Sequence, residues 1–231
     1  MGDFEGAARL VEQQAGRLLE QSGIVGLLNW ANRLPQALVQ ARPRLSVPVG
    51  RALALSGQVE AAEAYLQSAE IALAGAPKAD AQMLQGQIAA VRASIAAERA
   101  DAQRTVQCAR QALARLPSSE PSMPSLAAFN LGDAYLLTGD VVPVSATFAD
   151  AVDLSLAIGS LHMAVVSSAN LAQAETLRGR LMEAERACQR ALKVVAEVSA
   201  TQARTVPMVR MLYAYLSRPG CRTTWRAPRW R

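Results

Sequence analysis

Aromatic residues are scarce in this chain, at 4% of 231 residues, although 51% of the residues are hydrophobic. Strand-forming residues never gather into alternating runs bounded by turn residues, which argues against a β-sheet. Alanine and leucine dominate instead, and both lose little side-chain entropy in a helix. The composition therefore predicts an all-α protein whose helices pack closely through small side chains.

The chain also has few of the residues that enzymes and metal sites use. Its one histidine, His162, has no second titratable group placed beside it by spacing. Cys108, Cys188 and Cys221 lack CxxC spacing, and no histidine completes a metal site with them. We expect Cys108 and Cys188 to act as small buried hydrophobes. The sequence thus predicts a protein that is not an enzyme and has no catalytic residues, metal or cofactor.

Long apolar runs are missing as well. No run approaches the roughly 18 residues that a membrane span needs. The amino-terminal stretch MGDFEGAARL carries early acidic residues and no apolar core, unlike a signal peptide. An odd number of irregularly spaced cysteines favours reduced thiols. We therefore expect a cytoplasmic protein with no membrane partner.

The net charge of +5 comes from one end of the chain. The last fourteen residues contain five arginines and no acid, and the other 19 basic residues balance the 19 acidic ones. We expect residues 1–217 to form one repeat domain and 218–231 to be a basic Arg/Trp tail, disordered or non-native. Interleaved arginine and tryptophan can bind single-stranded nucleic acid, which leaves RNA association as a third functional hypothesis.

An internal repeat is clearest in residues 130–152. Small Gly132 and bulky Tyr135 would pack on a first helix, Gly139 would form the turn, and Phe148 and Ala151 would pack on a second helix. Numbered within the repeat, small residues stand at 8 and 27, bulky ones at 11 and 24, and glycine at 15. This pattern is typical of a tetratricopeptide repeat (TPR).

The same frame recurs on both sides of that segment. Its turn position falls at residues 23, 57, 100, 139 and 179, with separations of 34 to 43 residues. Residues 75–82 and 116–125 have the composition of linkers between repeats. Helix pairs with one apolar face must stack to bury it. We therefore predict a right-handed α-solenoid of antiparallel helix pairs, a TPR-like superhelix of about four to five repeats.

The amino-terminal part resembles a narrower family. In LLEQSGIVGLLNWANRLPQALVQARPRLSV, residues 18–47, a turn is followed by LLNW, LP and ARPRL, and then by the repeat GQVEAAEAYLQSAE at 57–70. This order is similar to the helical-repeat sensor region of large LuxR-type transcriptional regulators of the MalT kind. On the residues themselves, Trp30 is predicted to anchor the packing, and Pro35 and Pro43 to bracket a short helix.

That resemblance implies a signalling protein with a nucleotide-binding module, a helical sensor and a DNA-binding helix-turn-helix. The sequence has no G-x-x-x-x-G-K-[ST] phosphate loop and no terminal DNA-reading helix pair. A helix over about 202–217 would begin a fifth repeat without its partner helix. We therefore expect a sensor arm of a longer protein, and homo-oligomerisation through that uncapped carboxy-terminal helix.

The positions that face the concave groove of a TPR array are the candidate binding site. Asn130 and Asn170 share one repeat position, a helical turn from Asp133 and Gln173, so amides and a carboxylate should gather for hydrogen bonding. The alternative is that these asparagines bond a neighbouring backbone. Arg51 is isolated, which disfavours a clamp for a terminal carboxylate. The candidate ligand or partner residues are Arg51, Ser94, Phe129, Asn130, Asp133, Asn170 and Gln173.

Two main functions remain open at this point. The first is a non-catalytic sensor domain of a MalT-like regulator that holds a small inducer or an inhibitory protein in its groove. The second is a free-standing TPR adaptor that recognises a protein segment or peptide.

Overall fold

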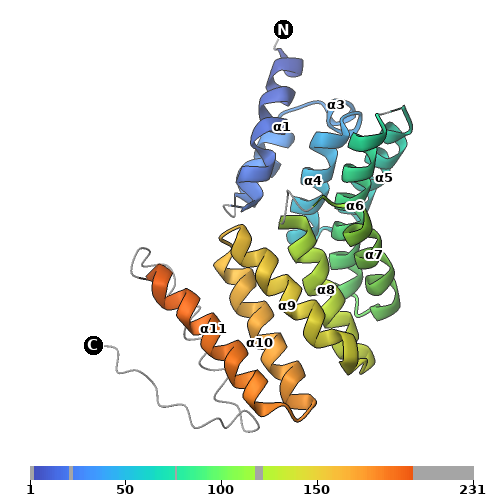
Figure 1. Ribbon diagram of the computed structural model, residues 1–231. Helices are drawn as coiled ribbons and strands as arrows, with labels where there is room; N and C mark the ends of the chain where they lie inside the picture. The colour runs from blue at the N-terminus through green and yellow to red at the C-terminus, as the bar shows by residue number, and fades with distance from the viewer. Residues whose placement is uncertain (1–2, 21–22, 76, 118–121, 200–231) are drawn as a thin grey trace. The chain divides into compact units, whose positions relative to one another are not determined.

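The computed structural model describes residues 3–20, 23–75, 77–117 and 122–199, and the regular structure in these ranges is entirely helical (Figure 1). The chain divides into two compact units, residues 1–117 and 118–231. The predicted helix over 202–217, the oligomerisation assigned to it and the tail over 218–231 lie outside the described residues. The predicted single domain over 1–217 therefore stays a prediction.

The first unit holds seven α-helices in its described part. Helix α4 packs against α5 and α6 against α7, while α4 also contacts α1 and α6. Proline at 35 precedes the five-residue helix α3 and proline at 43 begins α4, which confirms the predicted bracketing. The helices are α1 (Phe4–Glu20), α2 (Ile24–Ala31), α3 (Gln36–Gln40), α4 (Pro43–Leu55), α5 (Val59–Ala72), α6 (Lys78–Glu98) and α7 (Ala102–Arg115), with a 3-10 turn at Leu73–Gly75.

The second unit holds four longer helices in its described part. They are α8 (Ser122–Thr138), α9 (Val141–Ala157), α10 (Leu161–Leu177) and α11 (Leu181–Ser199). Each helix packs along the next one, and α8 also contacts α10 (Figure 1). The two units together therefore present four helix pairs in the described residues, as the repeat frame predicts.

The turns inside these pairs share one hydrogen-bonded geometry. Gly57 has φ +75°, its N–H donates to Ala54 O at 2.9 Å, and Gln58 N–H donates to Leu53 O at 2.9 Å. Such paired bonds cap the carbonyls of a helix end and need a left-handed residue. Positions 100, 139 and 179 repeat the geometry, with φ of 55°, 72° and 73°. The predicted turn positions from 57 onward are thus confirmed.

Two turns differ from the sequence expectation. Gly159, with φ +67°, ends α9 in the same geometry. The turn from α9 to α10, which joins two helix pairs, therefore has the same hydrogen bonds as the turns within the pairs. Gly23 has φ −80° and is not left-handed. A Cβ at Gly23 would lie 2.9 Å from Leu18 O, so this glycine serves close backbone approach.

The core follows the repeat frame closely. Phe148 is fully buried, and a Cβ added at Gly132 would lie 2.7 Å from its ring. Small residues at position 8 therefore leave the room that the bulky residue at position 24 fills. In the repeats with turns at 57, 100, 139 and 179, the second-helix positions 20, 24 and 27 whose side chains are described are buried: Ala62, Leu66, Ala69, Thr105, Ala109, Ala112, Val144, Phe148, Ala151, Ala184 and Cys188.

One packing prediction is wrong and two are confirmed. Trp30 is 42% exposed, and the fully buried Leu27 anchors α2 in its place. Trp30 instead lines an apolar pocket with Phe4 and Leu10. Cys108 and Cys188 are both buried thiols, as expected for small hydrophobes.

Candidate functional site

Helices α8 and α10 present the predicted groove positions of the second unit. On α8, Phe129, Asp133 and Leu137 are four residues apart and therefore share one face. On α10, Gln173 and Leu177 occupy the repeat positions of Asp133 and Leu137, and Asn170 occupies that of Asn130. Because α8 and α10 contact each other directly, the two rows of side chains form one surface, which we call the α8/α10 face.

A hydrogen bond joins the two helices at the centre of this face. Asn170 Nδ2 donates to Asp133 Oδ1 at 2.9 Å. Burial raises the pKa of the Asp133 carboxyl from 3.8 to about 6, and the hydrogen bond from Asn170 works in the opposite direction. The structure therefore brings together two of the predicted residues and leaves a poorly hydrated carboxyl between two helices.

The remaining predicted residues of this face differ in exposure. Gln173 is exposed, whereas Asn130 is only 5% exposed and belongs to the packed interior beneath the face. Phe129 is half-buried and packs edge-on against Phe148, with ring centroids 6.1 Å apart at 63°. Phe129 and Asn130 thus support the face, while Asp133, Asn170 and Gln173 are the polar groups nearest its surface.

Exposed leucines flank these polar groups. Leu137 and Leu177 stand at repeat position 13 of α8 and α10, and each is 64% exposed. Two large apolar side chains are therefore exposed to water at the same position of successive repeats. The face therefore combines a hydrogen-bonding centre with apolar edges.

The other two predicted residues belong to the first unit. Arg51 lies on α4 and is half-buried, and Ser94 lies on α6. Ser94 Oγ donates to Ala90 O of its own helix at 3.3 Å. Both residues belong to the first unit, so their assignment to one continuous groove with Asp133 and Asn170 stays a prediction.

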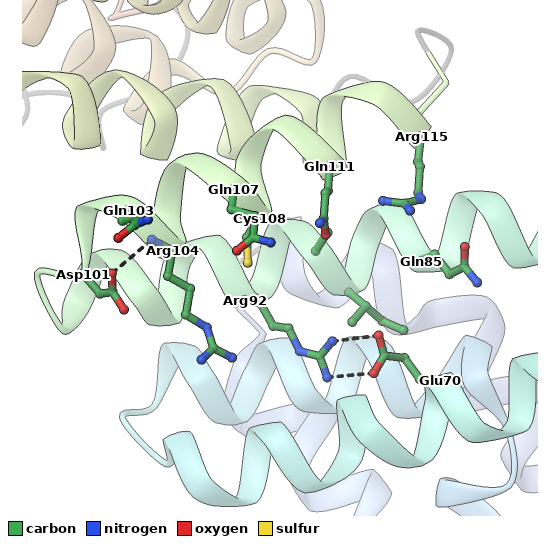
Figure 2. Close-up of a pocket in the computed structure, with 12 residues that line it drawn as sticks. Glu70, Gln85, Arg92, Asp101, Gln103, Arg104, Gln107, Cys108, Gln111 and Arg115 are labelled. Carbon is green, nitrogen blue, oxygen red and sulfur yellow. Dashed lines mark hydrogen bonds and ion pairs between the residues drawn. The ribbon is translucent and has the colours of Figure 1, made fainter. Parts of the chain in front are cut away.

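Sequence reasoning missed a cleft of about 610 Å³ in the first unit (Figure 2). It lies between α5, α6 and α7, and none of the predicted groove residues lines it. Arg92 of α6 bridges Glu63 and Glu70 of α5 at the side of the cleft. The only sequence feature that could have indicated this cleft is the series of glutamines on α7, and such a series is also typical of a solvent-exposed helix face.

Comparison with known families identifies the repeat. A family profile described as the MalT-like TPR region matches residues 86–218, more than half of the chain. The chain belongs to the MalT-like TPR family. This result confirms the resemblance seen in the sequence, and MalT-like TPR regions are repeat domains of the binding type, with no catalytic family indicated.

The fold has a solved counterpart. A crystal structure of the nearly identical TPR-like repeats of a Podosopora anserina putative kinesin light chain matches 87% of this chain and 100% of its own length. The TM-score is 0.51 and the sequence identity is 18%. At that identity the likeness concerns the fold alone, and it confirms the helical-repeat architecture. No curated protein matches the sequence.

Within the helices of the described ranges, none is long and apolar enough to cross a membrane. Among the same residues, no three histidine, cysteine or acidic side chains gather so that they could hold a metal ion.

Proposed function

We propose that this MalT-like TPR region is the sensor module of a LuxR-type regulator, and that the α8/α10 face holds its inducer or an inhibitory protein. The Asp133–Asn170 hydrogen bond carries the proposal, because it places a poorly hydrated carboxyl and a carboxamide between two packed helices. A carboxamide both donates and accepts hydrogen bonds, so the pair suits hydroxyl or amide groups of a ligand.

The apolar edges of the face support the same proposal. Leu137 and Leu177 would contact the apolar part of a ligand whose polar groups reach Asp133 and Asn170. Sites of this kind combine apolar surface with a few placed polar groups. In a regulator, the ligand would have to bind the active state more tightly than the resting state, because equal affinity for both states shifts no population.

The competing proposal is a TPR adaptor that binds a protein segment through the same face. A thermal-shift screen of the purified chain against sugars, nucleotides, amino acids and short peptides separates the two. A ligand at about a hundred times its dissociation constant adds roughly 2.7 kcal/mol of stability. A shift with one small-molecule class supports the sensor, and a shift with peptides alone supports the adaptor.

A variant of the face tests whether the ligand binds there. Asn170→Ala combined with Gln173→Ala should abolish the thermal shift while leaving the helical circular dichroism unchanged. Gln189, exposed on α11 away from these positions, provides the matched control as Gln189→Ala. An unchanged ligand shift in the double variant would refute the assignment of the face.

A further inference from the structure

The cleft of the first unit has polar walls whose spacing is regular. Four residues of α7 that line it follow one another at intervals of four: Gln103, Gln107, Gln111 and Arg115. Residues four apart lie on one side of a helix, each about 6 Å further along the axis. Figure 2 shows these side chains above the cleft, with Gln85 and Arg92 of α6 on the opposite wall.

That spacing approximates the repeat of an extended peptide. A strand advances about 6.6 Å for every two residues, and its backbone groups point to the same side at that interval. A glutamine carboxamide can donate one hydrogen bond and accept another, which matches a peptide unit. Three glutamines can therefore pair with alternate residues of one extended segment, and the flexible side chains absorb the small mismatch in pitch.

The charges on the opposite wall are already compensated. Arg92 donates to Glu63 through Nε and Nη2, at 2.9 and 2.6 Å, and to Glu70 through Nη1 and Nη2, at 2.7 and 2.9 Å. Burial opposes the charge of Arg92, but the bonds and charges of Glu70 and Glu63 outweigh that effect and raise its pKa. Because Arg92, Glu63 and Glu70 are paired with one another, their positions are fixed, and we do not expect them to bind a charged ligand strongly.

Arg115 is in a different situation at the carboxy-terminal end of α7. None of the ion pairs between described residues involves it, although its guanidinium lines the cleft. Arginine presents a fork of donors that matches a carboxylate. Along α7 the cleft therefore offers three carboxamides that can bind peptide units, and after them the guanidinium of Arg115, which can bind a carboxylate.

We propose that the α5/α6/α7 cleft binds an extended peptide segment of about six residues with a carboxylate at its last position. From Gln103 to Arg115 the helix rises about 18 Å, which an extended chain covers in five to six residues. The residues that line the cleft include no aromatic side chain on which a base could stack, which disfavours a single-stranded nucleic acid.

Fluorescence anisotropy with the whole chain tests the proposal. The probes are three amino-terminally labelled hexapeptides of alternating threonine and valine. One ends in glutamate with an amidated terminus, one in glutamine with a free terminal carboxylate, and one in amidated glutamine. At least one carboxylate probe should bind about tenfold more tightly than the neutral probe, and which one binds identifies the source of the carboxylate. Equal affinity for all three, or no saturable binding, overturns the proposal.

Two variants separate binding from folding. Arg115→Gln should remove the preference for the carboxylate while the neutral probe binds as before. Gln107→Ala should weaken all binding about fivefold, the value of one lost hydrogen bond. Arg110→Gln, on α7 outside the cleft, and Gln67→Ala, on α5, are the matched controls and should leave every affinity unchanged. A carboxylate preference that survives Arg115→Gln would overturn the assignment.

This site is independent of the α8/α10 face, since all of its residues belong to the first unit. Asn170→Ala should therefore leave the affinity of the carboxylate probes unchanged. Loss of their binding in Asn170→Ala, with Arg115→Gln behaving like the wild type, would place the peptide on the α8/α10 face and overturn the cleft as its site.

Discussion

Asn170 and Asp133, 37 positions apart in the sequence, are joined by a hydrogen bond of 2.9 Å from Nδ2 to Oδ1. The contact crosses from the first helix of one repeat to the first helix of the preceding one. Since the carboxyl is largely buried, the bond replaces part of its lost hydration. It does not replace all of it, because the pKa of Asp133 is still raised to about 6.

Replacing this carboxyl should change how stability depends on pH. Between pH 3.8 and 6 the folded chain holds a proton on Asp133 that the unfolded chain releases, so its stabilisation is full below pH 4 and lost as pH rises through 6. Asp133→Asn keeps an acceptor for Asn170. When the pH is raised from 4 to 7, the free energy of unfolding of this variant should increase by about 1 kcal/mol relative to that of the wild type. Urea unfolding at both pH values measures this difference.

Asp140→Asn provides the control for that experiment. Asp140 is exposed in the turn before α9, and its side chain makes no capping bond. Its substitution gives the change in stability that follows from removing one exposed carboxylate, measured at the same two pH values. If Asp133→Asn behaves in the same way as Asp140→Asn, Asp133 has no raised pKa in the folded chain.

The turn at Ala100 should be strained by its side chain. Ala100 adopts φ +55°, the left-handed conformation that glycine occupies at 57, 139 and 179. A Cβ in this region costs the folded chain about 1 kcal/mol. Glycine removes that cost, but it also gives the unfolded chain more conformational freedom, which cancels part of the gain. Ala100→Gly should therefore raise the free energy of unfolding by about 0.5 kcal/mol, measured by urea titration. A loss of stability would contradict this, and Gly139→Ala should show the opposite change.

The absence of a side chain at Gly132 should be required for the packing of the Phe148 ring and so for stability. A Cβ there would lie 2.7 to 2.9 Å from three atoms of the Phe148 ring, which is fully buried and cannot move aside. Gly132→Ala should destabilise the chain by about 1 to 3 kcal/mol. Gly16→Ala, in open space on α1, should instead stabilise by up to about 1 kcal/mol. Equal melting shifts for both variants would mean that Phe148 does not pack on Gly132.

The guanidinium of Arg92 should offset the electrostatic repulsion between the carboxylates of Glu63 and Glu70. Arg92→Met leaves Glu63 and Glu70 on the same side of α5 without their shared cation. We expect a loss of about 1 to 2 kcal/mol, because the arginine is mostly buried while the two acids are part-exposed. Adding Glu63→Gln and Glu70→Gln to the variant should restore most of the thermal stability. Failure of this rescue would assign the loss to packing of the arginine stem.

The repeat frame could be predicted from the sequence because its signals are local. A glycine or alanine at the turn and small and bulky residues at fixed offsets recur within each segment of about 40 residues. Gly57, Gly139, Leu66 and Phe148 therefore fall where the pattern places them. Trp30 was misjudged because an apolar helix does not reveal which of its sides faces the core, and the short helix α2 turns Leu27 inward.

The site could be predicted only in part, because its contacts cross between repeats. The frame placed Asp133 and Asn170 at neighbouring positions, but not the distance between them or the burial that raises the Asp133 pKa. Glu175 stands where the frame expects a bulky residue and is 5% exposed, with Arg178 at 3.7 Å as a partner. The cleft beside α7 depends on how α5 and α6 pack, which no local pattern encodes.

The most direct test of the proposed recognition face is a titration followed by nuclear magnetic resonance on the side-chain amides. The chain is titrated with pools of sugars, nucleotides, amino acids and short peptides, and the Asn170 and Gln173 carboxamide signals are observed. We predict that one pool shifts these signals saturably while those of Gln189 on α11 stay in place. If no pool moves the Asn170 signal, or if every shift falls outside α8 and α10, the α8/α10 face is not the ligand site.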